Sequence, residues 1–154
     1  MPINVLEQLY YNLIYCYSNY NICCYAATYT THTHRLLLLQ KKAIRNVTHS
    51  NYLAHTDHLF HSYRILKIDD IYKFNVGLYA YSHQHLFERI PSAYNIRNAN
   101  ELVPGRARIR ACEFSLSVSA PKIFNSIPTD IKSVDTLSSF KCRFKQHLLS
   151  SYIQ

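Results

Sequence analysis

Glycine occurs at only two positions in this chain, Gly77 and Gly105. Glycine is the residue that most readily adopts the positive φ angles of tight hairpin turns, so a chain with so few glycines is poorly suited to a β-sandwich built from hairpins. Helices joined by short connections need fewer such turns. The scarcity of glycine in a chain of 154 residues therefore favours helices over hairpins.

Apolar residues recur at steps of three and four in several segments, the spacing that places them on one face of a helix. The first predicted helix spans residues 4–25, and the second runs from about residue 33 to residue 47. A short helix is predicted after Thr56, a longer one starts near Asp69–Asp70, and a last helix follows Thr136. The predicted buried face of the last helix consists of Leu137, Phe140, Phe144 and Leu148.

Between residues 100 and 119 the pattern changes to an alternation of polar and apolar residues, which is typical of short strands. The fold class we expect is mainly α. It has a helical bundle-like N-terminal two-thirds, a small β element near residues 100–119 and a C-terminal helix. We expect a helical region at 1–90 and a mixed region at 91–154, together one incomplete domain fragment.

The stretch "RLLLLQKKAIRN", residues 35–46, combines four leucines with basic residues. Placed at 100° steps around a helix, the apolar residues gather on one face and the basic residues on the other. The expected core face consists of Leu36, Leu39, Ala43 and Val47, flanked by Leu37 and Ile44. Only Leu38 falls among the bases. A wide apolar face suits both packing in a core and lying on a membrane.

The formal charge of +8 is unevenly distributed, because residues 1–34 contain no lysine or arginine. A basic surface suggests nucleic acid or an anionic membrane as a partner. The period-two spacing in "GRARIRA" would align three arginines on one strand face, either to contact phosphates or to protect an edge strand. The candidate nucleic-acid-binding residues are Arg35, Lys41, Lys42, Arg45, Arg97, Arg106, Arg108, Arg110, Lys141, Arg143 and Lys145. The ordinary alternative for the basic residues of the last helix is a solvated face.

No catalytic constellation is found, and we expect no catalytic residue, no metal site and no cofactor. His55, His58 and His61 are spaced so that the first and last diverge around a helix. Asp69–Asp70 precede a helical pattern, where carboxylates stabilise a helix N-terminus. The five cysteines lack zinc-ligand spacing and are expected to be free, buried thiols.

Five segments, in this order, resemble the C-terminal thumb and post-thumb region of non-LTR (LINE-type) retrotransposon reverse transcriptases. They are "LEQLYYNLIYCYSNYNICCYAATYTTHTHRLLLLQKKAIRNVT", "YLAHTDHLF", "LKIDDIYKFNVGLYAY", "AYNIRNAN" and "SAPKIFNSIPTDIKSVDTLSSFKCRFKQHLL". The resemblance covers about residues 6 to 149. The chain departs from the family where Tyr25-Ala26 replace its usual Trp-Gly, and where Ala120 and Phe124 replace Gly and Trp.

The resemblance implies ancestry from an RNA-directed DNA polymerase of a transposable element, and contact with an RNA or DNA duplex. The family's fingers and palm precede these segments, and its paired-aspartate motif is missing. We therefore expect a truncated fragment that is no enzyme on its own, binds no small-molecule substrate and lies inside the cell. The alternatives are a peripheral membrane or protein-interaction module and a non-functional remnant. Spanning of a membrane is not expected, because polar residues interrupt the apolar N-terminal stretch.

Overall fold

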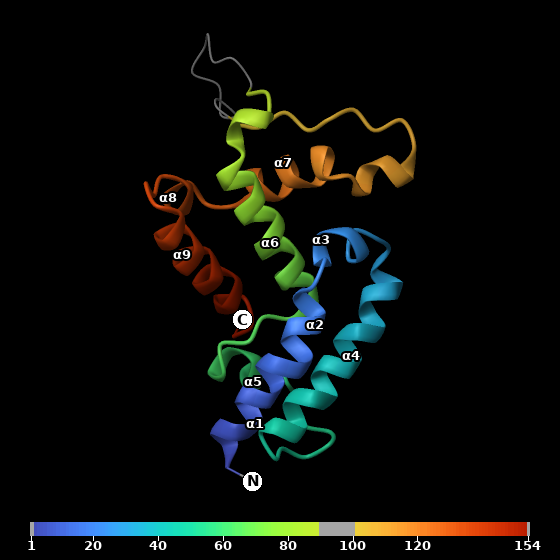
Figure 1. The fold of residues 1–154 in the computed structure, drawn as a ribbon, viewed down its shortest axis with the longest axis vertical. Helices are drawn as coiled ribbons and strands as arrows, with labels where there is room; N and C mark the ends of the chain where they lie inside the picture. Colours follow the sequence, from blue (N-terminus) through green and yellow to red (C-terminus); the bar gives the residue numbers. More distant parts are fainter. Residues whose placement is uncertain (1, 90–100, 154) are drawn as a thin grey trace. The chain divides into compact units, whose positions relative to one another are not determined.

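The N-terminal helical segment ends in a tight turn that is made by an asparagine instead of a glycine. The computed structural model describes residues 2–89 and 101–153 (Figure 1). The N-terminal rod consists of α1 (Ile3–Leu9), the π-helical segment η1 (Tyr10–Tyr15) and α2 (Cys16–Asn19). Asn21 then adopts a left-handed φ of 52° and starts α3 (Ile22–Tyr25). The single helix predicted for residues 4–25 is therefore wrong at its C-terminal end.

Two helices of the N-terminal part end in the same hydrogen-bonded motif, again without glycine. Beyond α4 (Thr30–Val47), His49 has a φ of 52°, and the Ser50 N–H donates to the Arg45 carbonyl at 3.0 Å. Beyond α5 (Asp57–Ser62), Arg64 has a φ of 54°. There the Ile65 N–H donates to the Phe60 carbonyl at 2.9 Å. A bond of this kind, from the third residue past the helix to a carbonyl of its last turn, is the Schellman motif. Asn21, His49 and Arg64 thus adopt left-handed backbone conformations at positions where glycine is the usual residue.

The remaining elements complete a mainly helical fold, which confirms the predicted fold class. They are α6 (Ile68–Ser82), η2 (Gln84–Leu86), η3 (Arg110–Phe114), α7 (Leu116–Ser126), α8 (Thr129–Lys132) and α9 (Leu137–Ser150). The chain divides into two compact units, residues 1–72 with 145–154 and residues 73–144. The predicted regions 1–90 and 91–154 have other bounds than these two units and stay a prediction.

The core of the first unit is organised around a buried amide. The α4 side chain Gln40 is 4% exposed. Its Nε2 donates to the Tyr10 hydroxyl at 2.9 Å and to the Leu66 carbonyl at 2.8 Å, and its Oε1 accepts from the Ile68 N–H at 2.9 Å. A buried amide with partners on both its nitrogen and its oxygen loses little by leaving water. Gln40 therefore joins the N-terminal rod, α4 and the start of α6.

This amide explains why the predicted core face of α4 is wrong at Leu36 and Leu39, although Val47 and the flanking Ile44 are buried as predicted. The buried residues of α4 are Thr33, Gln40, Ile44 and Val47, and α4 lies beside the N-terminal rod (Figure 1). Leu36 and Leu39 were expected in the core but are 39% and 61% exposed, and Ala43 is half-buried. At 100° steps Gln40 falls between Val47 and Ile44, and the buried partners of its amide make this side of α4 the core side rather than the side of Leu39.

A second polar cluster closes the first unit near its C-terminal end. The Tyr152 hydroxyl donates to Asp70 Oδ2 at 2.6 Å and accepts from the Lys67 N–H at 3.0 Å. The Lys67 ammonium lies 4.2 Å from the centroid of the Tyr152 ring and 3.0 Å from Asp57 Oδ1. Asp69 and Asp70 lie in the first turn of α6, as predicted. Asp70 in addition fixes the chain end to that turn.

The core of the second unit is an aromatic stack on α9. Phe140 is completely buried, and its ring lies 4.1 Å from that of Tyr81 and 5.6 Å from that of Phe144. Phe144 also stacks on Phe74 at 5.9 Å. Gly77 permits this approach, since a Cβ there would lie 2.5 Å from Phe144 Cε1. The buried positions predicted for Phe140, Phe144 and Leu148 are confirmed, whereas Leu137 is 48% exposed.

The β element predicted near residues 100–119 is wrong. Within the described residues no strand forms there, and Arg89 and Leu102 make only an isolated antiparallel bridge. The Asn125 side chain of α7 holds both backbone groups of Leu102, at 3.1 and 2.9 Å, and the Gly105 N–H donates to the Ser117 carbonyl at 3.0 Å. The segment is extended because α7 anchors it, without a neighbouring strand.

The prediction of buried thiols is also wrong. All five cysteines are free, but Cys23 is half-buried and the other four are exposed. Burial raises the pKa of the Cys23 thiol, and the neighbouring Cys24 raises it further. Helix faces that the sequence pattern assigned to a core therefore meet solvent in several places.

Alkaline conditions should unfold the first unit through its buried tyrosines. Burial raises the pKa of Tyr10 to about 12, although the hydrogen bond from Gln40 lowers it. Burial and then Asp70 raise the pKa of Tyr152. A raised folded-state pKa gives stability that is complete below the ordinary value near 10 and disappears as the pH rises toward the folded value. Ionisation of Tyr10 alone should lower the free energy of unfolding by about 2–3 kcal/mol between pH 10 and pH 12.

Urea unfolding measured at several pH values from 8 to 12 checks this expectation. Tyr10→Phe should flatten the alkaline decline, whereas Tyr20→Phe, at a position that is 79% exposed, is the matched control and should follow the unmodified chain. An equal alkaline decline in the unmodified chain, Tyr10→Phe and Tyr20→Phe would contradict the assignment of this decline to the ionisation of Tyr10.

Candidate nucleic-acid interface

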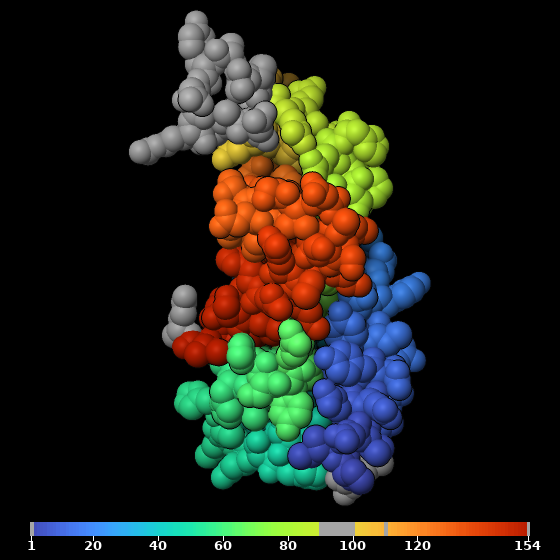
Figure 2. Space-filling view, turned by 90° about the vertical axis from the view of Figure 1, so that its left-hand side faces the viewer, coloured from blue at the N-terminus to red at the C-terminus, as the bar shows by residue number. Residues whose placement is uncertain are grey.

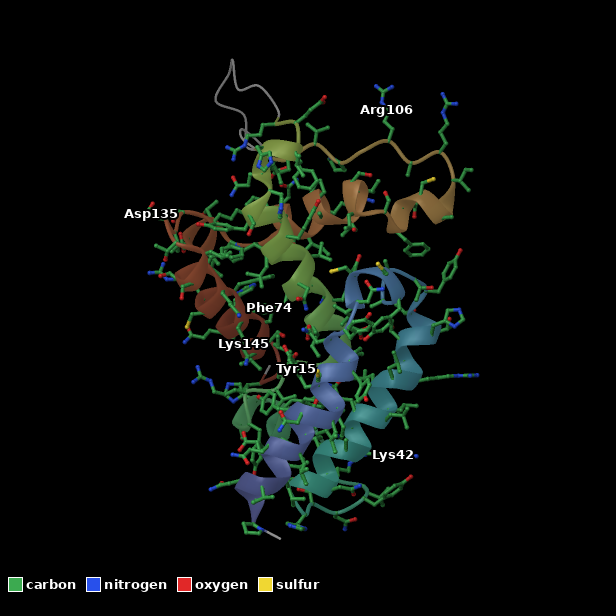
Figure 3. The ribbon with its side chains drawn as sticks, viewed as in Figure 1. Tyr15, Lys42, Phe74, Arg106, Asp135 and Lys145 are labelled. Carbon is green, nitrogen blue, oxygen red and sulfur yellow. The ribbon has the colours of Figure 1, made fainter. Side chains whose placement is uncertain are left out.

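The α4 helix carries four cations and no acidic residue. Arg35 and Lys42 are exposed, and Lys41 and Arg45 are half-buried. Lys42 points away from the N-terminal rod (Figure 3). Within residues 2–89 and 101–153, none of the three residues Arg35, Lys41 and Lys42 forms an ion pair. Their charges are therefore available to an anionic partner.

Arg45 has a structural task as well as a charge. Its Nε donates to the Ala54 carbonyl at 3.0 Å and so holds the loop that follows α4. A guanidinium has five N–H donors, and this bond uses one of them. The sequence assigned Arg45 to a binding surface only, because the pattern does not reveal that the loop returns to the helix.

A small pocket lies where this loop meets α4. It has a volume of about 200 Å³ and is lined by Lys42, Arg45, Asn46, Ser50 and Tyr52. Two predicted residues, Lys42 and Arg45, are brought together here. Asn46, Ser50 and Tyr52 were not predicted, since nothing in the sequence places residues 50–52 beside the last turns of α4.

The arginines of "GRARIRA" lie on the extended segment before α7. Arg106 and Arg108 are exposed, and Figure 3 shows Arg106 pointing away from α7. Arg110 begins η3, but its side chain lies outside the described part of the structure, as does the whole of Arg97. Without a strand, the predicted alignment of three arginines on one strand face does not form. Arg106 and Arg108 remain exposed cations on an anchored segment.

The basic residues of α9 surround its aromatic face. Lys141 and Arg143 are exposed, and an Nη1 of Arg143 donates to the Asp130 carbonyl at 3.4 Å. Figure 2 shows α8 and the first turns of α9 as adjacent surface at the orange-to-red end of the colour range. Lys145 is half-buried and belongs to the first unit. The candidate residues on α4 and Lys145 thus belong to the first unit, and those on the segment before α7 and at the start of α9 belong to the second.

A larger cavity, in the second unit, is lined by side chains of both charge signs. It has a volume of about 650 Å³, and Arg89, Glu101 and Lys132 are among its lining residues. The Lys132 ammonium donates to the Asn125 carbonyl at 2.9 Å, and burial lowers its pKa. Because this cavity combines both charge signs, it has less cationic character than the pocket at Lys42 and Arg45.

Asp70 lies beside Tyr152, and no three His, Cys, Asp or Glu side chains in residues 2–89 and 101–153 gather where they could hold a metal ion. The same residues include no helix with the length and apolar character needed to cross a membrane.

The exposed cations on α4, on the segment before α7 and on α9 are the candidate residues that the structure leaves accessible to solvent. Comparisons with models of protein families, with curated proteins and with solved structures find no match for this chain.

Proposed function

We propose that the chain is a thumb and post-thumb fragment of a LINE-type reverse transcriptase, and that its activity is salt-sensitive binding of nucleic acid. The five collinear segments support the ancestry. The mainly helical fold agrees with it, and the fragment has no polymerase activity of its own because the palm segments are not among these residues.

The observation that carries the binding proposal is the charge of α4. Four cations lie on one helix without a single carboxylate, and Arg35 and Lys42 face solvent. Cations that protein carboxylates do not neutralise attract the phosphate backbone, which gains affinity by releasing condensed counterions. The exposed Arg106, Arg108 and Lys141 supply further charge of the same sign.

A second function is favoured by the exposed leucines of α4. Leu36, Leu38 and Leu39 are 39%, 46% and 61% exposed and share the solvent side with Arg35 and Lys42. An exposed apolar row bordered by cations also suits an anionic lipid surface. Flotation with anionic vesicles separates the two functions. Co-flotation that Leu39→Ser abolishes, without nucleic-acid binding, would favour the membrane.

Pairwise charge removal tests the nucleic-acid proposal. Three double variants each remove two exposed cations: R35Q/K42Q on α4, R106Q/R108Q before α7 and K141Q/R143Q on α9. With a fluorescently labelled RNA–DNA hybrid that has a single-stranded overhang, anisotropy should show a loss on the order of tenfold per phosphate contact removed at about 0.1 M salt. We expect the largest loss for the α4 variant, because α4 carries four cations, one more than α9.

The control removes the same charge elsewhere. Arg89 and Lys122 are exposed cations outside the candidate set, and R89Q/K122Q should weaken binding least. If this control weakens binding as much as the α4 variant does, net charge alone explains the affinity and the assigned positions are wrong.

A further inference from the structure

The pocket at the end of α4 is held together by its own hydrogen bonds. The Thr48 and Ser50 hydroxyls lie 2.8 Å apart, and the Leu53 N–H donates to Asn51 Oδ1 at 3.3 Å. The bond from Arg45 Nε to the Ala54 carbonyl closes the loop at its far end. The loop therefore presents its side chains from a fixed backbone.

The chemistry of this pocket suits a phosphate group. Lys42 and Arg45 line it together with an amide and a hydroxyl, and no acidic residue is among the lining residues. A helix C-terminus ordinarily repels anions through its unpaired carbonyls. Here the carbonyls of Ile44, Arg45 and Asn46 already accept bonds from N–H groups of residues 48–50, at 3.0 to 3.4 Å. The charge of the pocket is therefore set by Lys42 and Arg45, which favour an anionic ligand.

The size of the pocket limits what enters it. About 200 Å³ is below the roughly 300–1,000 Å³ typical of pockets that enclose a whole small molecule. A phosphate fits, whereas an attached base must remain outside. The Tyr52 ring lines the same pocket and is 69% exposed, so it offers an aromatic face at the rim. An aromatic face beside a phosphate site is the arrangement on which unpaired bases stack.

We propose that this pocket binds one unpaired nucleotide, with its phosphate between Lys42 and Arg45 and its base stacked on Tyr52. The inference rests on the proposed function and makes it more specific: at this site the chain prefers single-stranded nucleic acid or an unpaired overhang. A base inside a blunt duplex is stacked on its neighbours and has no free face for Tyr52.

The absence of tryptophan from the whole sequence makes a direct test simple. Tyr52→Trp places a unique fluorophore at the proposed stacking position. Its emission should be quenched by a single-stranded oligonucleotide and changed little by a blunt duplex of the same sequence. Tyr20→Trp, at an exposed position of the same unit, is the matched control and should not be quenched.

Affinity gives a second readout on the same oligonucleotides. Tyr52→Ala should weaken single-strand binding by roughly 5- to 150-fold, the range for loss of one stacked base, and Tyr52→Phe should stay within about threefold because the ring remains. Binding by anisotropy with unquenched Tyr52→Trp and an unaffected Tyr52→Ala would overturn the pocket assignment and leave the proposed function intact. No binding to any oligonucleotide would overturn both.

Discussion

Replacing Gln40 by alanine should lower the free energy of unfolding by about 3–5 kcal/mol. The substitution removes an amide but leaves its partners buried: the Tyr10 hydroxyl, the Leu66 carbonyl and the Ile68 N–H. Each buried polar group left without a partner costs about 1–3 kcal/mol. Urea unfolding measures the total. Hydrogen exchange at the Ile68 amide reports whether that particular bond has been lost.

Gln8→Ala is the matched control, because Gln8 is an exposed glutamine on α1. Alanine has a helix propensity at least equal to that of glutamine, so this change should remain within about 0.5 kcal/mol. A Gln40→Ala effect as small as that of Gln8→Ala would show that Gln40 does not hold the three elements together. The buried face assigned to α4 would then be wrong.

Replacing Phe140 by alanine should destabilise the second unit by about 3–5 kcal/mol, the usual range for removing a buried phenylalanine. Phe140 is completely buried between the rings of Tyr81 and Phe144, so its loss leaves a cavity with aromatic walls. Calorimetric or urea unfolding gives the magnitude. Loss of near-ultraviolet circular dichroism from the tyrosines would show that the stack has disordered.

Leu137→Ala on the same helix separates packing from helix propensity. Leu137 is 48% exposed, and its truncation should cost less than about 1 kcal/mol. Similar losses for the two variants would mean that Phe140 contributes as part of the helix rather than as the centre of an aromatic core.

The parts of the fold that the sequence predicted correctly are those where the buried face is apolar throughout. Phe140, Phe144 and Leu148 are spaced so that only one face of α9 can be buried, and the structure buries it. On α4 the same reasoning fails because Gln40 takes a core position. A residue-type pattern cannot show that Tyr10, Leu66 and Ile68 will surround that amide.

The segment before α7 shows a different limit. The alternation in "GRARIRA" is the period of a strand, but a strand needs a partner for its backbone groups. Asn125 and Ser117 supply hydrogen bonds from a helix instead. Local alternation thus predicted a strand, whereas the hydrogen-bond partners of this segment lie on α7.

The candidate cations could be found from the sequence because charge is visible there. The pocket could not, because it depends on a loop that returns to α4 through the bond from Arg45 to Ala54. Tyr52 is one of 14 tyrosines and has no distinguishing local pattern. Only its place beside Lys42 and Arg45 sets it apart.

The dependence of nucleic-acid affinity on salt tests the central proposal most directly. The full chain is titrated against a labelled RNA–DNA hybrid between roughly 50 and 200 mM salt, within the range where counterion release governs affinity. The logarithm of the binding constant should fall linearly with the logarithm of the salt concentration, with a slope of about −0.9 per phosphate neutralised on a duplex. If Arg35 and Lys42 both contact phosphates, the R35Q/K42Q variant should make this slope shallower by about 2. Absent binding, or a flat slope, would contradict the proposal that these exposed cations serve a nucleic-acid backbone.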